Sequence, residues 1–293
     1  MTTPSLYKTA AGEKAVMDIY DKALAQWPVA YETLILPTRH GDTFVIACGS
    51  ETALPLILLH GAGTNSTIWR GDIRSYSQNY RVYAVDLLGE AGKSAANRPA
   101  WDSPAYAEWL EDLLDALHIE KAALVGISQG GWTALKFAVN QPTRVENLVL
   151  ICPGGVVPDK KSFIIRAIGF SLMGKKGLQR MIRLLYGKQP IPEGVEDAVA
   201  VVMGNFKARL GILPIFSDME LGRLTMPTLL IGGTDDPMRD LDSIAARLQT
   251  FVPNLKVDII PGAGHVVLNT IERIMTFLNM ERSVHEMSMV TPG

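Results

Sequence analysis

The chain has 293 residues, of which 47% are hydrophobic and 20% charged, and its formal net charge at pH 7 is -2. This is the composition of an ordinary globular protein, and a charge so close to zero gives no overall reason to expect a nucleic acid or a membrane as partner. The sequence contains no run of about 20 apolar residues, so it predicts no transmembrane helix.

The first 26 residues predict a short tail followed by an amphipathic helix. Charged residues are spread through this segment, and no apolar block follows a charged start, so it does not resemble a secretion signal. The two cysteines, Cys48 and Cys152, lie in apolar runs and are expected to be buried free thiols. Free thiols are compatible with a reducing compartment, and the expected location is cytoplasmic.

The first half of the chain alternates strand-like and helix-like segments. Tyr31–Leu36 and residues 43–47 flank the turn His40-Gly41-Asp42 and predict a hairpin. Short apolar runs, typical of strands buried on both faces of a parallel sheet, follow at Leu54–Leu59, 82–85, Ala122–Ile127 and 148–152. Between these runs we expect two helices, one with Ser103 as N-cap and Pro104 at its first position, and one starting over 132–139.

The alternation stops between residues 157 and 224, where helical patterns replace strands, for example over 163–170 and 178–186. It resumes with a strand over 227–231, a helix over 240–250, a strand over 256–260 and a helix over 266–277. A helical insert inside such a series predicts a cap over one end of the sheet, with an apolar pocket beneath it. The side chains expected to line this pocket are Phe163, Ile164, Ile168, Phe170, Met173, Met181, Leu184 and Leu185. The predicted domains are a core of residues 1–156 and 225–280, a helical cap of residues 157–224, and a loose C-terminal tail of residues 281–293.

The segment Gly126-Ile127-Ser128-Gln129-Gly130 matches the pattern G-x-S-x-G, directly after a predicted strand and before a predicted helix. A serine on so sharp a turn is lifted clear of the sheet, and the glycines leave room for the neighbouring strand and helix. The helix N-terminus behind it favours developing negative charge. The alternative is an ordinary turn in which Ser128 is only a helix N-cap, but that would not require glycine on both sides.

From Leu54 to Phe277 the sequence resembles the α/β-hydrolase superfamily, within it the capped, esterase-like branch. Four landmarks occur in the family's order: His60-Gly61, Asp86-Leu87-Leu88-Gly89, the serine turn, and Gly262-Ala263-Gly264-His265. The resemblance implies an α/β fold with a mostly parallel eight-stranded sheet flanked by helices and a helical cap inserted after strand six. It also implies a structural role for His60 in fixing its loop.

The same resemblance assigns a catalytic triad of Ser128, Asp235 and His265. His265 follows the last strand, where a loop histidine can reach the serine. The family's pattern of a glycine, two residues and an acid selects Asp235 when counted from Gly232, and Asp236 remains the alternative, although an aspartate before a proline also suits a turn. The loop after strand six, Cys152-Pro153-Gly154-Gly155, contains no acid, which excludes the other position that some members use.

An oxyanion hole requires two backbone N–H donors, and the resemblance places them at Ala62 and Gln129. The predicted function is hydrolysis of a small carboxylic ester through an acyl-enzyme, with no cofactor and no metal. Haloalkane dehalogenases and epoxide hydrolases of this fold carry aspartate where this chain has Ser128. Two alternatives stay open: a carbon–carbon bond hydrolase or perhydrolase using the same triad, and a ligand receptor that retains the triad.

Two other patterns are set aside. The segment Gly89-Glu90-Ala91-Gly92-Lys93-Ser94 lacks the first glycine of a phosphate-binding loop, because Leu87 stands there. The chain has no H-E-x-x-H or C-x-x-C pattern, so no zinc site is predicted.

The cap is rich in basic residues, which suits either an anionic substrate or acidic surface, or simply the solvated faces of amphipathic helices. They are Lys160, Lys161, Arg166, Lys175, Lys176, Arg180, Arg183, Lys188, Lys207 and Arg209.

Overall fold

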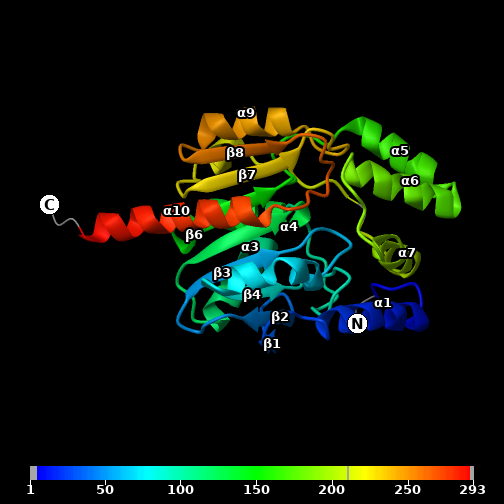
Figure 1. Cartoon of the computed structure of the whole chain (residues 1–293), viewed down its shortest axis with the longest axis horizontal. Helices are drawn as coiled ribbons and strands as arrows, with labels where there is room; N and C mark the ends of the chain where they lie inside the picture. Colours follow the sequence, from blue (N-terminus) through cyan, green and yellow to red (C-terminus); the bar gives the residue numbers. More distant parts are fainter. Residues whose placement is uncertain (1–4, 210, 291–293) are drawn as a thin grey trace.

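An eight-stranded sheet with the strand order β1-β2-β4-β3-β5-β6-β7-β8 forms the centre of the molecule (Figure 1). The computed structural model describes residues 5–209 and 211–290. β1 and β2 form the predicted antiparallel hairpin, β2 pairs antiparallel with β4, and the remaining neighbours are parallel. The predicted α/β fold with a mostly parallel eight-stranded sheet is thus confirmed. The strands are β1 (Tyr31–Leu36), β2 (Thr43–Cys48), β3 (Leu54–Leu59), β4 (Tyr80–Val85), β5 (Ala122–Ile127), β6 (Val145–Ile151), β7 (Thr228–Gly233) and β8 (Leu255–Ile260).

Helices cover both faces of the sheet because the strands are apolar on both faces. Alternate strand residues enter separate cores: Ile57 and Leu59 lie in one, Leu56 and Leu58 in the other. The first core is completed by α3 (Ala105–Ala116), α4 (Gln129–Asn140) and α9 (Leu241–Phe251). The second core is completed by α1 (Ala10–Leu24), the short helices η1 (Ser66–Gly71) and α2 (Ile73–Ser77), and α10 (Ile271–Val290).

Several helix boundaries differ from those predicted: α4 begins at Gln129 and not near residue 132, and α10 begins at Ile271 and not at residue 266. α3 begins at Ala105, and its cap residue is Pro104, whose side chain has no hydrogen-bonding atom. The Ser103 hydroxyl donates to the carbonyl of Ala100 (2.6 Å) and accepts the N–H of Ala105 at 3.4 Å. α10 continues through residues 281–290, where a loose tail was expected. No glycine or proline interrupts this stretch before Pro292, so nothing in the local sequence ends the helix. In Figure 1 this helix extends away from the sheet on the side opposite α5 and α6.

Among the described residues between β6 and β7, where the sequence predicts the cap, there are four helices: α5 (Lys161–Ser171), α6 (Gly174–Tyr186), α7 (Val195–Asn205) and α8 (Asp218–Leu221). α5 and α6 form a hairpin that projects from the molecule (Figure 1). α7 packs against α1, and an isolated antiparallel bridge joins Tyr7 to Phe206. The N-terminal segment is therefore attached to the inserted helices, a contact that the sequence patterns did not indicate.

Across the described part of the chain, none of the helices combines the length and apolarity needed to cross a membrane.

Candidate active site

Ser128 lies in the sharp turn between β5 and α4, with the strained backbone angles φ 53° and ψ -107°. A side chain at Gly126 would place its Cβ 2.5 Å from the carbonyl oxygen of Gly130, and one at Gly130 would come 2.2 Å from that of Leu59. Both glycines are therefore required by close backbone approach. The Ser128 side chain forms no helix-cap hydrogen bond, so the alternative role as an N-cap is not observed.

His265 follows β8, and its Nε2 lies 3.0 Å from the Ser128 Oγ. The loop that carries it is attached to the end of α6. Ala263 forms an antiparallel bridge with Gly187, and the N–H of Val266 donates to the carbonyl of Leu185 (2.9 Å). The end of α6 thus helps to orient the imidazole.

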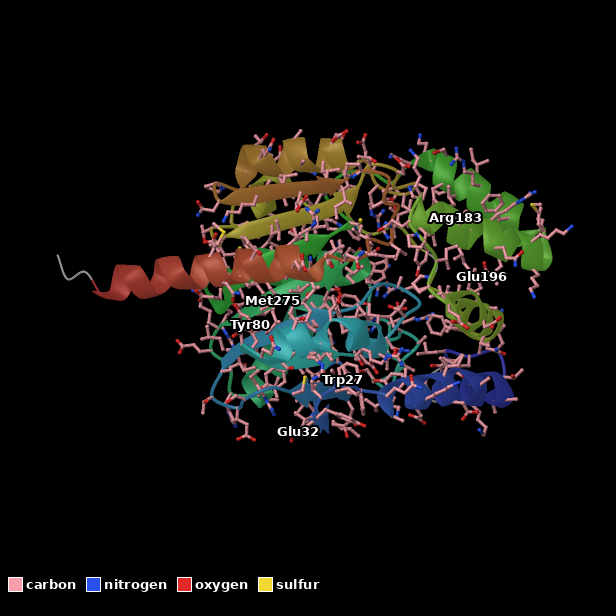
Figure 2. The ribbon with its side chains drawn as sticks, in the orientation of Figure 1. Trp27, Glu32, Tyr80, Arg183, Glu196 and Met275 are labelled. Carbon is pink, nitrogen blue, oxygen red and sulfur yellow. The ribbon has the colours of Figure 1, made fainter. Side chains whose placement is uncertain are left out.

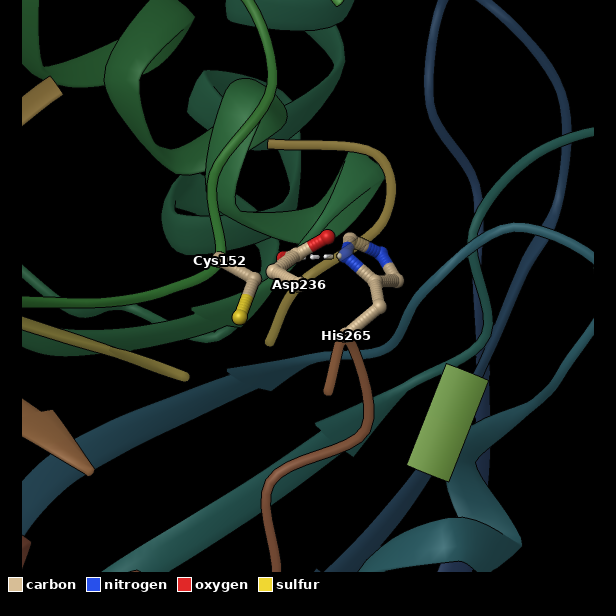
Figure 3. A group of neighbouring side chains, drawn as sticks. All are labelled: Cys152, Asp236 and His265. Carbon is tan, nitrogen blue, oxygen red and sulfur yellow. Dashed lines mark hydrogen bonds and ion pairs between the residues drawn. The ribbon is translucent and has the colours of Figure 1, made fainter. Parts of the chain in front are cut away.

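The acidic partner of His265 is Asp236 and not Asp235. The Asp236 Oδ2 lies 2.8 Å from His265 Nδ1, and its carboxylate is directed at the imidazole (Figure 3). Asp235 points elsewhere: its side chain is one-third exposed and lies 3.5 Å from the Nζ of Lys188. The expected contact between Asp235 and His265 is therefore corrected to the alternative, Asp236. The cause is that β7 continues to Gly233, so the glycine from which the acid must be counted is one residue later.

Asp236 also performs the turn function that the sequence suggested for an aspartate before proline. Its Oδ1 accepts the N–H groups of Met238 (2.7 Å) and Arg239 (2.9 Å), while Oδ2 contacts His265. Burial alone would raise the pKa of this carboxyl, but these hydrogen bonds and the imidazole outweigh it and hold the pKa below its ordinary value. The carboxylate is thus ionised and oriented, as needed to stabilise a protonated histidine.

Cys152 lies beside this pair, and its sulfur, the Asp236 carboxylate and the His265 ring offer ligand atoms within 4.8 Å of one another (Figure 3). Burial, together with the nearby Asp236, raises the pKa of the Cys152 thiol well above its ordinary value. The Asp236 Oδ2 and the His265 Nδ1 are already hydrogen-bonded to each other (2.8 Å), so these two atoms serve the triad. Cys48 is also buried and free, as predicted.

The two expected oxyanion donors belong to segments beside Ser128: Gln129 directly follows it, and a Cβ at Gly61, the residue before Ala62, would lie 3.7 Å from the Ser128 Cβ. Gln129 is the first residue of α4, where a backbone N–H has no intrahelical acceptor. Ala62 is exposed in the loop after β3.

His60, directly after β3, is fully buried. Its Nε2 accepts the N–H of Leu87 (2.9 Å), and burial lowers the pKa of its imidazole. The neutral ring holds the β3 and β4 loops together, as the resemblance implied.

Glu90 is a site residue that the sequence patterns did not single out. It is only 3% exposed, and its carboxylate accepts the backbone N–H of Gly63 (2.7 Å) and the side-chain N–H of Gln129 (3.0 Å). It therefore joins the two segments that carry the expected oxyanion donors. One sequence signal could have identified Glu90: it is an acidic residue between the small residues Gly89 and Ala91 in the loop after β4. This loop is the segment that was rejected above as a phosphate-binding loop.

A cleft of about 800 Å³ opens between α6 and α7, next to Asp235. Figure 2 shows Arg183 on α6 and Glu196 on α7, which both line it. Its walls mix apolar side chains, among them Phe170 and Leu184, with several charged ones. Phe170 and Leu184 were expected in an apolar pocket above Ser128, but this cleft is partly polar, and its lining includes neither Ser128 nor Met181.

A serine, a histidine and an aspartate joined by two hydrogen bonds at the carboxyl ends of a mostly parallel sheet have the geometry of a serine hydrolase triad. Residues 56–273 match the model of the alpha/beta hydrolase family. The chain therefore belongs to the α/β-hydrolase family.

Similar proteins include carboxylesterases and a hydrolase named for dienedioate and trienedioate substrates. The uncharacterized carboxylesterase nap of Bacillus subtilis (strain 168) is 34% identical over 279 residues, 90% of this chain and 92% of the relative. The crystal structure of naproxen esterase (carboxylesterase NP) from Bacillus subtilis superposes with a TM-score of 0.81 at 31% identity, covering 92% of this chain and 99% of that one. A 2-hydroxy-6-oxononadienedioate/2-hydroxy-6-oxononatrienedioate hydrolase of Paraburkholderia xenovorans (strain LB400) is 30% identical over 242 residues, 74% of this chain and 81% of the relative.

Proposed function

We propose that this protein is a serine carboxylesterase that hydrolyses a small carboxylic ester through an acyl-enzyme intermediate. The observation that carries the proposal is the hydrogen-bonded chain from Ser128 through His265 to Asp236. Relatives that are carboxylesterases, similar over nine-tenths of this chain, support it. The two buried free thiols fit a cytoplasmic location, which is part of the proposal.

In the proposed mechanism, the Ser128 Oγ attacks the ester carbonyl while Nε2 of His265 takes its proton. Asp236 holds the Nδ1–H of the imidazole and stabilises the imidazolium. The carbonyl oxygen, now an oxyanion, accepts hydrogen bonds from the backbone N–H groups of Ala62 and Gln129. His265 then protonates the departing alcohol, and a water molecule activated by the same histidine releases the acid from Ser128.

The function is tested with a panel of substrates. We expect turnover of p-nitrophenyl esters, with a preference among acyl lengths that describes the pocket. Dienoate and peracid-forming substrates are included, because the same triad performs those reactions in the two enzyme alternatives. Faster turnover of a dienoate than of any ester would replace the proposal with carbon–carbon bond hydrolysis. No turnover of any substrate by folded protein would favour the receptor.

We expect Glu90→Gln to lower kcat about 10- to 100-fold with little change in KM. A glutamine has only one accepting oxygen and brings an NH₂ group toward a donor, so one of the two bonds of Glu90 is lost. A buried hydrogen bond to a charged group is worth about 1.5–3 kcal/mol, and a small displacement of a positioning segment costs up to about 100-fold in rate. Steady-state kinetics with a soluble ester measure this.

The matched control is Glu111→Gln, because Glu111 accepts a hydrogen bond from the side chain of Gln141 (2.7 Å) away from the site. If Glu90 has only a structural role, Glu90→Gln will lower the melting temperature without changing kcat below the transition. An unchanged kcat at that temperature would remove Glu90 from the proposed machinery.

A further inference from the structure

The charge of this protein is unevenly distributed. Residues 160–192 contain eight basic residues and no acidic one, although the whole chain has a net charge of -2. Residues 160–192 comprise the whole hairpin of α5 and α6 and a few residues on either side of it. Among the described residues, only one of the eight lies within ion-pair distance of a carboxylate, namely Lys188 with Asp235. The basic residues are Lys160, Lys161, Arg166, Lys175, Lys176, Arg180, Arg183 and Lys188.

The hairpin is a closely packed unit. Gly177 is buried in α6, and a Cβ at this position would lie 1.8 Å from the carbonyl oxygen of Phe170 in α5. The two helix backbones therefore approach closely. Phe163, Ala167 and Phe170 are half-buried at helical spacing, and α6 is the helix against which α5 packs. This stripe is the inner face of α5.

A second apolar stripe on α5 and the turn after it is exposed. Ile165 is 72% exposed, Ile168 60% and Leu172 84%, and α5 contains no buried residue. A helix that is apolar on both faces is normally covered on both, and contiguous exposed apolar surface on a monomer marks an interaction site. The hairpin also projects from the molecule, as Figure 1 shows, so its outer face is accessible.

We propose that the outer face of the α5–α6 hairpin docks on an anionic lipid surface. Exposed aliphatic side chains flanked by lysine and arginine are the features by which a helix lies in a membrane interface, and basic clusters bind anionic headgroups. Lys161, Arg166 and Lys175 are exposed on α5 and at the start of α6. The other basic residues of α6 and the residue Lys188 line the cleft toward α7 and are not counted toward this face. Charge complementarity selects this partner, because an acid-free basic segment repels a second copy of itself. No membrane partner was expected from the sequence, because the net charge of the whole chain is only -2. That total conceals the basic segment, since acidic residues elsewhere in the chain offset its charge. The proposed docking is peripheral and independent of the esterase activity.

The experiment is sedimentation of the full chain with vesicles. We expect binding to vesicles of about equal parts phosphatidylcholine and phosphatidylglycerol, and little binding to phosphatidylcholine alone. Raising the salt from about 0.1 M to about 1 M shortens the Debye length from about 10 Å to about 3 Å and should weaken binding. Ser128→Ala protein should bind equally well, which separates this proposal from the proposed catalysis.

Variants locate the surface. Ile165→Ser and Leu172→Ser should each weaken binding about tenfold or more, the value of burying one aliphatic side chain. Lys161→Gln and Lys175→Gln should each weaken it about fivefold, the value of one basic residue near an anionic surface. Ile35→Ser is the matched apolar control, because Ile35 is 70% exposed on β1, and Lys22→Gln on α1 is the charge control. Helical content and turnover of a short soluble ester should stay unchanged in all six.

Three outcomes would overturn the proposal. The wild-type protein fails to bind the anionic vesicles, or the hairpin variants bind as well as the two controls. In the third outcome, the wild-type protein is a dimer, Ile165→Ser makes it a monomer, and neither form binds vesicles. This result would show that a second copy of the chain, and not a lipid surface, covers the exposed face of α5.

Discussion

Replacing Ser128 with alanine is expected to remove ester turnover almost completely and to leave the fold intact. The proposed nucleophile is the Ser128 Oγ, whose hydrogen-bond partner is His265. The variant therefore loses the attacking atom, but α4 loses no capping hydrogen bond, because the Ser128 side chain makes none. Loss of such a serine lowers kcat by a factor on the order of a million, and a low residual activity persists from the oxyanion hole and substrate binding. Alanine has a Cβ as serine does, so the backbone strain at φ 53° is unchanged.

The measurement combines steady-state turnover of a p-nitrophenyl ester with labelling by a fluorophosphonate. Wild-type protein should carry one label, on the peptide that contains Ser128. Ser243→Ala is the control, because Ser243 is exposed on α9, and this variant should retain full activity and labelling. A label on another serine, or activity close to wild type in Ser128→Ala, would exclude the assigned nucleophile.

Asp236→Asn is expected to lower kcat about 10,000-fold, whereas Asp235→Asn should change it by about twofold at most. An asparagine at position 236 favours the wrong tautomer of His265, since its NH₂ group donates where the carboxylate accepted. The protonated imidazole also loses its ionised partner. Asp235 is partly exposed and near Lys188, and a substitution at such a surface pair changes free energies by no more than about 0.5 kcal/mol.

Steady-state kinetics of the two purified variants decide between the acids, with melting curves to show that both are folded. This pair is a close control, because the two changes are chemically identical and one residue apart. Equal losses would show that the Asp236–His265 hydrogen bond does not determine the rate. A larger loss in Asp235→Asn would require a different arrangement of the loop after β7 during catalysis.

Most of the sheet was predictable because its strands are buried on both faces. An uninterrupted apolar run such as Leu54–Leu59 requires helices on both sides, and this requirement is local to the run. The turn at Ser128 was predictable for a similar reason. Its glycines at positions 126 and 130 are demanded by backbone atoms a few ångströms away, so the five-residue pattern specifies the turn.

The choice between Asp235 and Asp236 depended on tertiary structure. Both acids fit the pattern, and the difference lies in where β7 ends against β8, which sets the side chain that turns toward His265. Glu90 became a site residue only when folding brought Gly63 and Gln129, which are distant in the sequence, to its carboxylate.

The sequence by itself determined the sheet, the position of Ser128 and the helical insert, because hydrophobic period and glycine spacing act over a few residues. The tertiary structure alone decided the acid, the attachment of the His265 loop to α6, and which apolar face of α5 is covered. These depend on contacts between residues far apart in the chain. Composition and periodicity contain no information on which of two apolar stripes meets a neighbouring helix.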